Sequence, residues 1–241
     1  MLAGSRARIE AELAADALVL DVGGWGSPWP RADWVIDLMP YDTRGLYGES
    51  DGRPERFSAD TWVQRDICDH EPWPFADDQF DFAVCSHTLE DVRDPIRVCE
   101  ELVRVAKAGY VEVPSRLEEQ SPLGWHPGVG WTHHRWLIDV DPAAPRIDFV
   151  FKHGVVYTSA DAQFPPGFHD SLTDEERVSC FWWEGLFAFG ERVMMSAEEL
   201  DPYLADFVDG ELRGRGLRRP SRARRLAQRT QRALESLRQP S

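Results

Sequence analysis

A glycine-rich turn separates two short apolar segments near the start of the chain, and an acidic residue ends the second segment. The first segment, 18–22, leads directly into the turn 23–26, and the second segment, 34–36, ends at Asp37. Glycines after a first strand let backbone approach a ligand closely, and a carboxylate after the second can accept hydrogen bonds from ribose hydroxyls. The pattern predicts a nucleoside-type cofactor site, and the alternative is an ordinary turn between two core strands.

A dinucleotide is not the cofactor that this turn favours. Counted from Gly24, the dinucleotide fingerprint G-x-G-x-x-G needs its third glycine where Trp29 stands. Pro28 and Pro30 disfavour the helix whose amino terminus would hold a pyrophosphate. The span 23–33 is also too short for a full crossover helix. A cofactor with a ribose but no phosphate fits better, and we expect S-adenosylmethionine (SAM).

The segments that must position this site predict an α/β protein. Asp94 and Pro95 mark the start of a helix, because Asp caps helices and Pro favours the first helical position. Buried strands separated by turns and this helix indicate a Rossmann-like, mainly parallel sheet with flanking helices. The predicted strands of this part are 18–22, 34–36, 62–65, 80–85 and 110–113.

The second half of the chain has a different pattern, with runs of β-forming residues. Runs of β-forming residues at 135–140, 146–152 and 181–189 predict antiparallel C-terminal strands of the same sheet, or a small β subdomain. We expect one domain over 1–210, with core motifs in 17–115 and a substrate-side insert at 115–160, followed by an Arg-rich helical tail, 211–241.

Charge is distributed unevenly along the 241 residues, whose formal net charge is −15. Residues 211–241 hold ten Arg and two Glu, so residues 1–210 hold 17 basic and 40 acidic side chains, a balance of −23. An acidic body disfavours nucleic acid as a partner, because phosphates need a basic surface. We expect the tail to dock on the acidic body or to be a partly disordered end; contact with an acidic membrane or with a partner subunit are the alternatives.

The remaining features predict a cytoplasmic protein. No run approaches 18 apolar residues, and the first 17 residues lack the apolar core of a secretory signal. The four cysteines show no C-x-x-C spacing and are expected to be reduced and buried. A homodimer is a further expectation.

Four short motifs give the chain a family resemblance over about 17–115. They are Pro74-Phe75-Ala76-Asp77, Phe80-Asp81, Leu89 to Pro95, and Glu101 to Gly109. In these motifs the chain resembles the class I SAM-dependent methyltransferases, in particular the methyltransferase-11-like branch. Asp91 departs from the histidine usual in that branch, and Trp25 stands in place of the usual second glycine of the turn.

The resemblance implies a set of cofactor contacts. Asp37 would hold the ribose hydroxyls, Asp66 the adenine amino group and the Ile67 backbone a ring nitrogen. The rest would border the methionine part or the sulfonium of SAM. The full set is Asp21, Gly23, Gly24, Trp25, Asp37, Asp66, Ile67, Cys85, Ser86 and His87.

Methyl transfer to a hydroxyl also needs alignment and a group that removes the acceptor proton. By position, the catalytic candidates are His87, His133, His134 and Glu112. The acceptor-binding candidates are His126, Trp131 and Arg135. A divalent metal is compatible with two histidines and a carboxylate, but none is predicted, because adjacent side chains point apart on an extended chain.

The acceptor is expected to be small and polar. Trp, His, Arg and Glu concentrate in the second half of the chain, which suits a sugar or glycan, with S-adenosylhomocysteine (SAH) as the other product. Two alternatives remain: a module that binds SAM or SAH without turnover, and a methyltransferase that modifies proteins.

Overall fold

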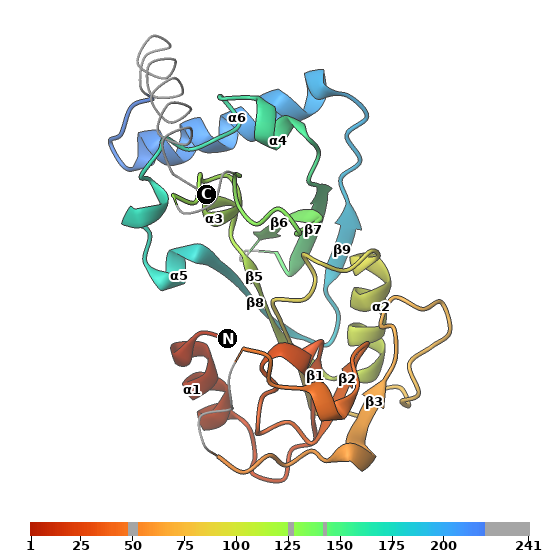
Figure 1. The fold of residues 1–241 in the computed structure, drawn as a ribbon. Helices are drawn as coiled ribbons and strands as arrows, with labels where there is room; N and C mark the ends of the chain where they lie inside the picture. Colours follow the sequence, from red (N-terminus) through yellow and green to blue (C-terminus); the bar gives the residue numbers. More distant parts are fainter. Residues whose placement is uncertain (48–52, 125–127, 142–143, 220–241) are drawn as a thin grey trace, which may run out of the picture.

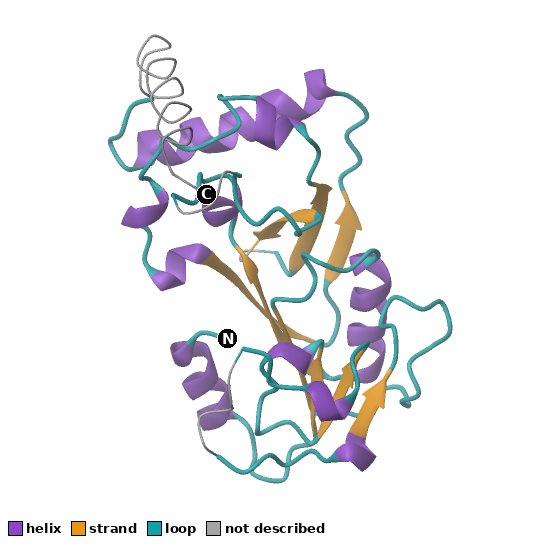
Figure 2. Ribbon diagram, viewed as in Figure 1, coloured by secondary structure: helices purple, strands orange, loops and turns teal. Residues whose placement is uncertain are grey.

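The structure is a computed structural model and describes residues 1–47, 53–124, 128–141 and 144–219. Two sheets stand one above the other in the view of Figure 1, and helices cover their outer faces. The long strands of the main sheet run from the lower part of the molecule toward the upper part, as Figure 2 shows. This arrangement confirms the predicted α/β fold class.

Six strands form the main sheet in the order β3-β2-β1-β4-β5-β8. Neighbouring strands are parallel except the last pair, in which β8 runs antiparallel to β5. The predicted Rossmann-like sheet with an antiparallel C-terminal strand is therefore confirmed. Its strands are β1 (Val19–Val22), β2 (Trp34–Asp37), β3 (Trp62–Gln64), β4 (Phe82–Ser86), β5 (Ala108–Pro114) and β8 (Val178–Glu184).

The connections among the first strands are unusually short for parallel pairs. Between β1 and β2 lies a single 3₁₀ turn, η1 (Gly24–Gly26), as the proline-rich span predicted. Between β2 and β3 lie two more, η2 (Tyr41–Thr43) and η3 (Ala59–Thr61). The carboxyl ends of β1, β2 and β4 consequently meet at one edge of the sheet without a helix over them, which leaves room for a ligand.

Helices bury the two faces of the main sheet. On one face, Ile9 of α1 (Ala3–Glu12) packs into a cluster with Val19, Val35 and Trp62. On the other face, α2 (Pro95–Val105) contributes its apolar stripe to the largest core cluster: Val98, Cys99, Leu102 and Val105. Asp94 caps α2 by accepting a hydrogen bond from the Arg97 N–H at 3.0 Å, as predicted.

The second sheet has three strands in the order β6-β7-β9. They are β6 (Trp136–Asp141), β7 (Arg146–Phe151) and β9 (Ala188–Glu191). Its one face joins the main core through Ile138, Ile147 and Phe149, and its other face packs on two helices, α4 (Val155–Thr158) and α6 (Ala197–Gly214). The second sheet therefore lies between the main core and these two helices.

The prediction of a single β-run at 181–189 is wrong. Gly185, at a φ of +67°, ends β8, and the chain resumes in β9 of the other sheet. The glycine supplies a left-handed backbone that a β-run of ordinary residues does not provide. One segment thus joins the two sheets.

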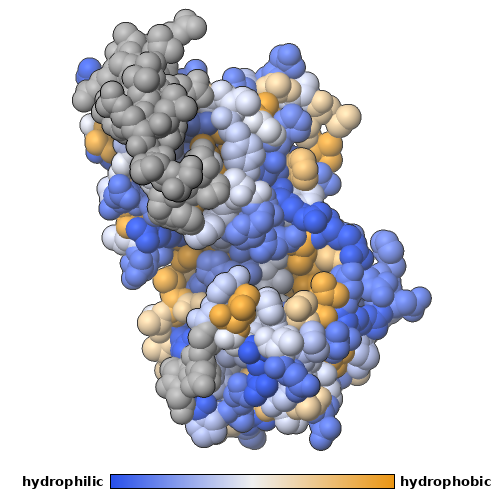
Figure 3. Space-filling view, in the orientation of Figure 1, coloured by the Kyte–Doolittle hydropathy of each residue, from blue (hydrophilic) through white to orange (hydrophobic). Residues whose placement is uncertain are grey.

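Three further short helices lie in the second half: α3 (Arg116–Glu119), η4 (His169–Ser171) and α5 (Asp174–Arg177). The last helix, α6, continues past residue 210 to Gly214, and residues 220–241 of the predicted tail lie outside the described part. Among the helices that the structure describes, none is long and apolar enough to cross a membrane. On the face drawn in Figure 3, hydrophilic side chains predominate and hydrophobic ones form small groups.

Candidate functional site

A cavity of about 650 Å³ opens at the carboxyl ends of β1, β2 and β4. The turn after β1, the end of β2 and the loops after β3 and β4 all contribute to its wall. Nine of the ten predicted cofactor residues line it: Asp21, Gly23, Gly24, Trp25, Asp37, Asp66, Ile67, Ser86 and His87. The cavity lies where a nucleoside cofactor is expected in a parallel α/β sheet.

Asp21 lies beneath the glycine turn and is almost fully buried. Its Oδ2 accepts a hydrogen bond from the Trp29 N–H at 2.7 Å. A Cβ on Gly24 would come within 2.4 Å of that same oxygen, so the absence of a side chain lets the turn rest on the carboxylate. Burial raises the pKa of Asp21 to about 7, against the lowering effect of the Trp29 hydrogen bond.

Asp37 joins the end of β2 to the glycine turn. Its Oδ2 accepts from the Trp25 N–H at 3.0 Å and its Oδ1 from the Met39 N–H at 2.8 Å. Burial raises the pKa of Asp37, although these backbone hydrogen bonds lower it in part. Each carboxylate oxygen has a second lone pair, so both can still accept from ribose hydroxyls.

Asp66 follows β3 and is already paired. Its Oδ2 forms an ion pair with Arg93, and its Oδ1 accepts from the Cys68 N–H at 2.9 Å. Burial would raise the pKa of Asp66, but the Arg93 guanidinium and the Cys68 N–H lower it. An adenine amino group at this position would share the carboxylate with Arg93. The sequence does not predict this pairing of Arg93 with Asp66.

Cys85 is the one predicted cofactor residue that does not line the cavity. Its side chain is completely buried in the core cluster that packs against α2. Strand residues alternate between the two faces, and Cys85 shares the α2 face with Ala83. The expectation that the Cys85 side chain lies beside the sulfonium is therefore wrong.

A second cavity of about 630 Å³ adjoins the first. His87 and Asp91 line both of them. The predicted catalytic residues Glu112, His133 and His134, and the predicted acceptor residue Trp131, also line the second cavity. Arg135 lines the first cavity instead, and His126 lies outside the described residues.

His87 sits between two buried carboxylates. Its Nδ1 lies 3.6 Å from Glu90 Oε1 and its Nε2 lies 3.2 Å from Glu112 Oε1. Burial would lower the pKa of His87, but the hydrogen bonds to Glu112 and Glu90 raise it to about 9. Burial would likewise raise the pKa of Glu112, but hydrogen bonds from His87 and the Leu2 N–H lower it to about 2. At neutral pH this shift favours the imidazolium form of His87, which has no lone pair to accept a proton.

A buried polar chain supports the histidine pair from below. His134 Nδ1 lies 2.7 Å from Glu119 Oε1, and Glu119 in turn forms an ion pair with Lys152. Lys152 Nζ also donates to the Trp131 carbonyl at 2.8 Å. Because a carboxylate only accepts, His134 donates to Glu119 from Nδ1, and in the neutral imidazole this tautomer leaves the lone pair on Nε2.

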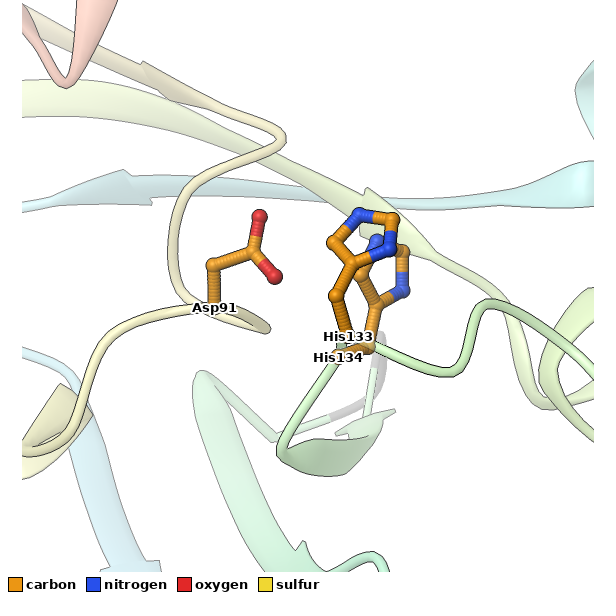
Figure 4. A group of neighbouring side chains, drawn as sticks. All are labelled: Asp91, His133 and His134. Atoms are coloured by element: carbon orange, nitrogen blue, oxygen red, sulfur yellow. The ribbon is translucent and has the colours of Figure 1, made fainter.

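Both histidines come from a tight turn. The His134 N–H donates to the Trp131 carbonyl at 3.3 Å, and the rings of His133 and His134 lie 4.5 Å apart between centroids. Asp91, from the loop after β4, faces them in Figure 4, with potential ligand atoms of all three residues within 4.8 Å of one another. The expectation that the adjacent imidazoles diverge is wrong, because it assumed an extended chain.

Glu90, Glu119 and Lys152 were not among the predicted site residues. One signal in the sequence could have pointed to Lys152: Lys107 and Lys152 are the only lysines beside 25 arginines. Glu90 and Glu119 have no such signal, because each stands in an ordinary charged segment. Their partners, His87 for Glu90 and His134 and Lys152 for Glu119, are known only from the structure.

The comparisons with known proteins address this geometry. A family profile described as a methyltransferase domain matches residues 48–111, which span β3, β4, α2 and part of β5. The predicted resemblance to the methyltransferase-11-like branch is confirmed for this segment. A match to that family implies SAM as the cofactor.

Solved structures resemble the chain over less than half of its length. The YcgJ protein of Bacillus subtilis is 20% identical, covering 46% of this chain and 50% of its own, with a TM-score of 0.36. A SAM-dependent methyltransferase from Aquifex aeolicus is 18% identical, covering 47% and 65%, with a TM-score of 0.33. One from Thermotoga maritima is 20% identical, covering 48% and 52%, also at 0.33. No curated protein matches the chain.

The residues of the first cavity fit SAM. SAM carries a sulfonium and an ammonium group, and the buried carboxylates of Asp21 and Asp37 complement such positive charge. The buried indole N–H of Trp29, on the same wall, has no hydrogen-bond partner in the described part of the chain. It is therefore free to donate to a ligand.

Proposed function

We propose that the chain is a SAM-dependent methyltransferase that methylates an oxygen of a small polar acceptor, with a sugar or glycan as the preferred acceptor. The observation that carries the proposal is the contact between two cavities. The first fits SAM, the second is lined by imidazoles and carboxylates, and they share His87 and Asp91. A donor in one cavity and an acceptor in the other would meet there.

SAM supplies, when bound, a methyl group on a positively charged sulfur and leaves as SAH. The chain's own contribution is charge and alignment. The walls of the two cavities hold eight Asp and Glu side chains against four Arg side chains, His87 and the amino terminus of Met1, and this small excess of negative charge favours a cationic ligand. The rigid carboxyl ends of β2 and β4 would fix its orientation, and in-line transfer depends on alignment.

The second cavity supports a hydroxyl-bearing acceptor. Glu118 is buried there and holds the Trp131 indole N–H at 3.2 Å, so that ring stands fixed in the wall. A fixed aromatic ring beside imidazoles suits a ring-shaped acceptor with several hydroxyls. A cavity rather than a flat face also favours a small molecule over a folded protein.

Calorimetry with SAM and SAH on the purified chain tests the cofactor site. We expect binding of both, weakened at least tenfold in Asp37→Ala, which removes the carboxylate that would hold the ribose. Asp42→Ala, an exposed acid of η2, is the matched control and should bind normally. Absence of binding to both ligands, or equal binding by Asp37→Ala, would overturn the proposed site.

Methyl transfer from isotope-labelled SAM to a panel of sugars and phenols tests the reaction. Transfer to a sugar hydroxyl supports the proposal. Binding of SAM without transfer to any acceptor in the panel would favour the non-catalytic module. Labelling of added proteins instead would favour the protein-modifying alternative.

A further inference from the structure

We infer that Asp91, His133 and His134 form a binding site for one divalent transition-metal ion. The three residues lie on the wall of the second cavity, and Asp91 also lies on that of the first. The metal would therefore sit where the two cavities meet. Its role in methyl transfer rests on the proposed function, whereas its binding does not.

The donor set is the first argument. Two imidazoles and one carboxylate with open positions are a ligand set of catalytic zinc and of non-haem iron, whereas Mg²⁺ and Ca²⁺ prefer oxygen ligands. The donor atoms span at most 4.8 Å, against about 3.4 Å between ligands of a tetrahedral ion with bonds near 2.1 Å. Asp91 and His133 are exposed, so small side-chain rotations close that difference.

The partner of His134 is the second argument. Histidines that bind metals almost always donate their other N–H to a carboxylate or carbonyl, which fixes the tautomer. His134 Nδ1 has such a partner at 2.7 Å in Glu119, whose charge is balanced by the buried Lys152. Nε2 is thus the nitrogen left for a metal. An ordinary surface histidine would not need a buried ion pair beneath it.

The free carboxylate is the third argument. The structure gives the Asp91 side chain neither a hydrogen bond nor an ion pair with any residue it describes, although arginines line the same cavity. Among the described residues, His133 has only ring contacts, with Trp131 and His134. Asp91 and His133 thus lack polar partners in the described part of the chain, and His134 has a fixed tautomer. A cation between the three residues would be their missing partner.

A cation here would bind the acceptor hydroxyl and lower its pKa, which removes the need for a general base. His87 lies between Glu90 and Glu112, and these carboxylates favour its imidazolium form over the neutral form that a general base needs. In the reaction, the O–H bond breaks and its proton passes to water. The oxygen forms a bond to the methyl carbon, the carbon–sulfur bond breaks, and its electron pair returns to sulfur.

Titration of the full chain, freed of any affinity tag, with Co²⁺ tests the site by visible absorption, and calorimetry with Zn²⁺ complements it. We expect one Co²⁺ per chain, displaced by Zn²⁺. Asp91→Asn and His133→Gln should each weaken binding at least tenfold, and both positions are exposed, so folding is unaffected. His70→Gln, an exposed histidine outside both cavities, is the control.

Absence of saturable binding, or unchanged affinity in Asp91→Asn and His133→Gln, would overturn the inference. SAM calorimetry after removal of metal separates the two proposals. SAM binding without Co²⁺ binding leaves the methyltransferase proposal standing and refutes the metal site. Co²⁺ binding without SAM binding does the reverse.

Discussion

His87, directly after β4, and Glu112 of β5 contact each other twice. The His87 N–H donates to the Glu112 carbonyl at 2.8 Å, and His87 Nε2 lies 3.2 Å from Glu112 Oε1. The backbone bond extends the pairing of β4 with β5 by one residue, and His87 takes a φ of +53° there. Because the main chain fixes the ring beside the carboxylate, the imidazolium is a built part of the cavity wall.

His87→Asn should make stability less dependent on pH. The pKa of His87 is raised to about 9, so its stabilisation is complete below the ordinary pKa of 6.5 and disappears as the pH rises through 9. We expect the variant to lose about 1–2 kcal/mol of unfolding free energy at pH 6 and little at pH 10. The ring is 45% exposed, so solvent screens its ion pairs and keeps the loss at pH 6 this small. Asn tolerates the positive φ. Urea unfolding from pH 6 to pH 10 measures this difference.

His70→Asn controls for the general effect of removing a histidine and should follow the wild type at each pH. A constant difference between wild type and His87→Asn from pH 6 to pH 10 would show that the ion pairs of His87 with Glu90 and Glu112 do not contribute.

Asp21→Asn should stabilise the free protein and abolish tight SAM binding. The pKa of Asp21 is raised to about 7, so ionisation of this buried group opposes folding increasingly from about pH 4 to pH 7 and fully above. Asn avoids that effect and can still accept from the Trp29 N–H. At pH 8 we expect a gain on the order of 3 kcal/mol in unfolding free energy.

The same carboxylate should make SAM binding pH-dependent in the wild type. A cationic ligand favours the ionised form, so affinity should rise as the pH passes through 7, and Asp21→Asn should lose the dependence. Calorimetry at pH 6 and pH 8 measures it. Equal affinity at both pH values would contradict a contact between Asp21 and the positive part of SAM.

The sequence predicted the first half of the fold better than the second. Asp94 and Pro95 mark a helix start by local chemistry alone, and the strand before Asp37 is apolar throughout, so both were found. The division of 181–189 between two sheets depends on one glycine turn and on which partner strands are nearby. Pairing over such distances along the chain leaves no local pattern.

The same limit applies to the site. Asp37 could be placed because strand ends of a parallel sheet meet at one edge, whatever the loops do. Asp91 meets His133 only because the loop after β4 crosses the turn before β6, and Arg93 reaches Asp66 across 27 residues. A family resemblance predicts roles only for residues that match the family's motifs. Asp91 departs from its motif, so its neighbours His133 and His134 could be found only in the structure.

Gly24→Ala should weaken both folding and SAM binding. The new Cβ would lie 2.4 Å from Asp21 Oδ2, so the buried carboxylate would have to leave the Trp29 N–H. We expect a loss of about 1–3 kcal/mol in unfolding free energy and at least a tenfold loss of SAM affinity. Gly4→Ala is the matched control: nothing lies within 4 Å in α1, and Ala should stabilise the helix by up to about 1 kcal/mol. A harmless Gly24→Ala would mean that the turn does not rest on Asp21.

The two lysines of the chain form a natural comparison. Lys152 is 0% exposed and pairs with Glu119, whereas Lys107 is 56% exposed and pairs with Asp81 at 2.7 Å. Lys152→Met removes the lysine partner of the buried Glu119 carboxylate, which keeps only its contact with His134, and should lower the unfolding free energy by about 3–5 kcal/mol. Lys107→Met should lower it by less than about 1 kcal/mol. In the double variant Lys152→Met/Glu119→Gln the loss should be smaller than the sum of the single losses, because no buried charge is left alone. Urea unfolding of these three variants and of Glu119→Gln alone measures these values, and additive losses in the double variant would show that the pair does not act as a unit beneath His134.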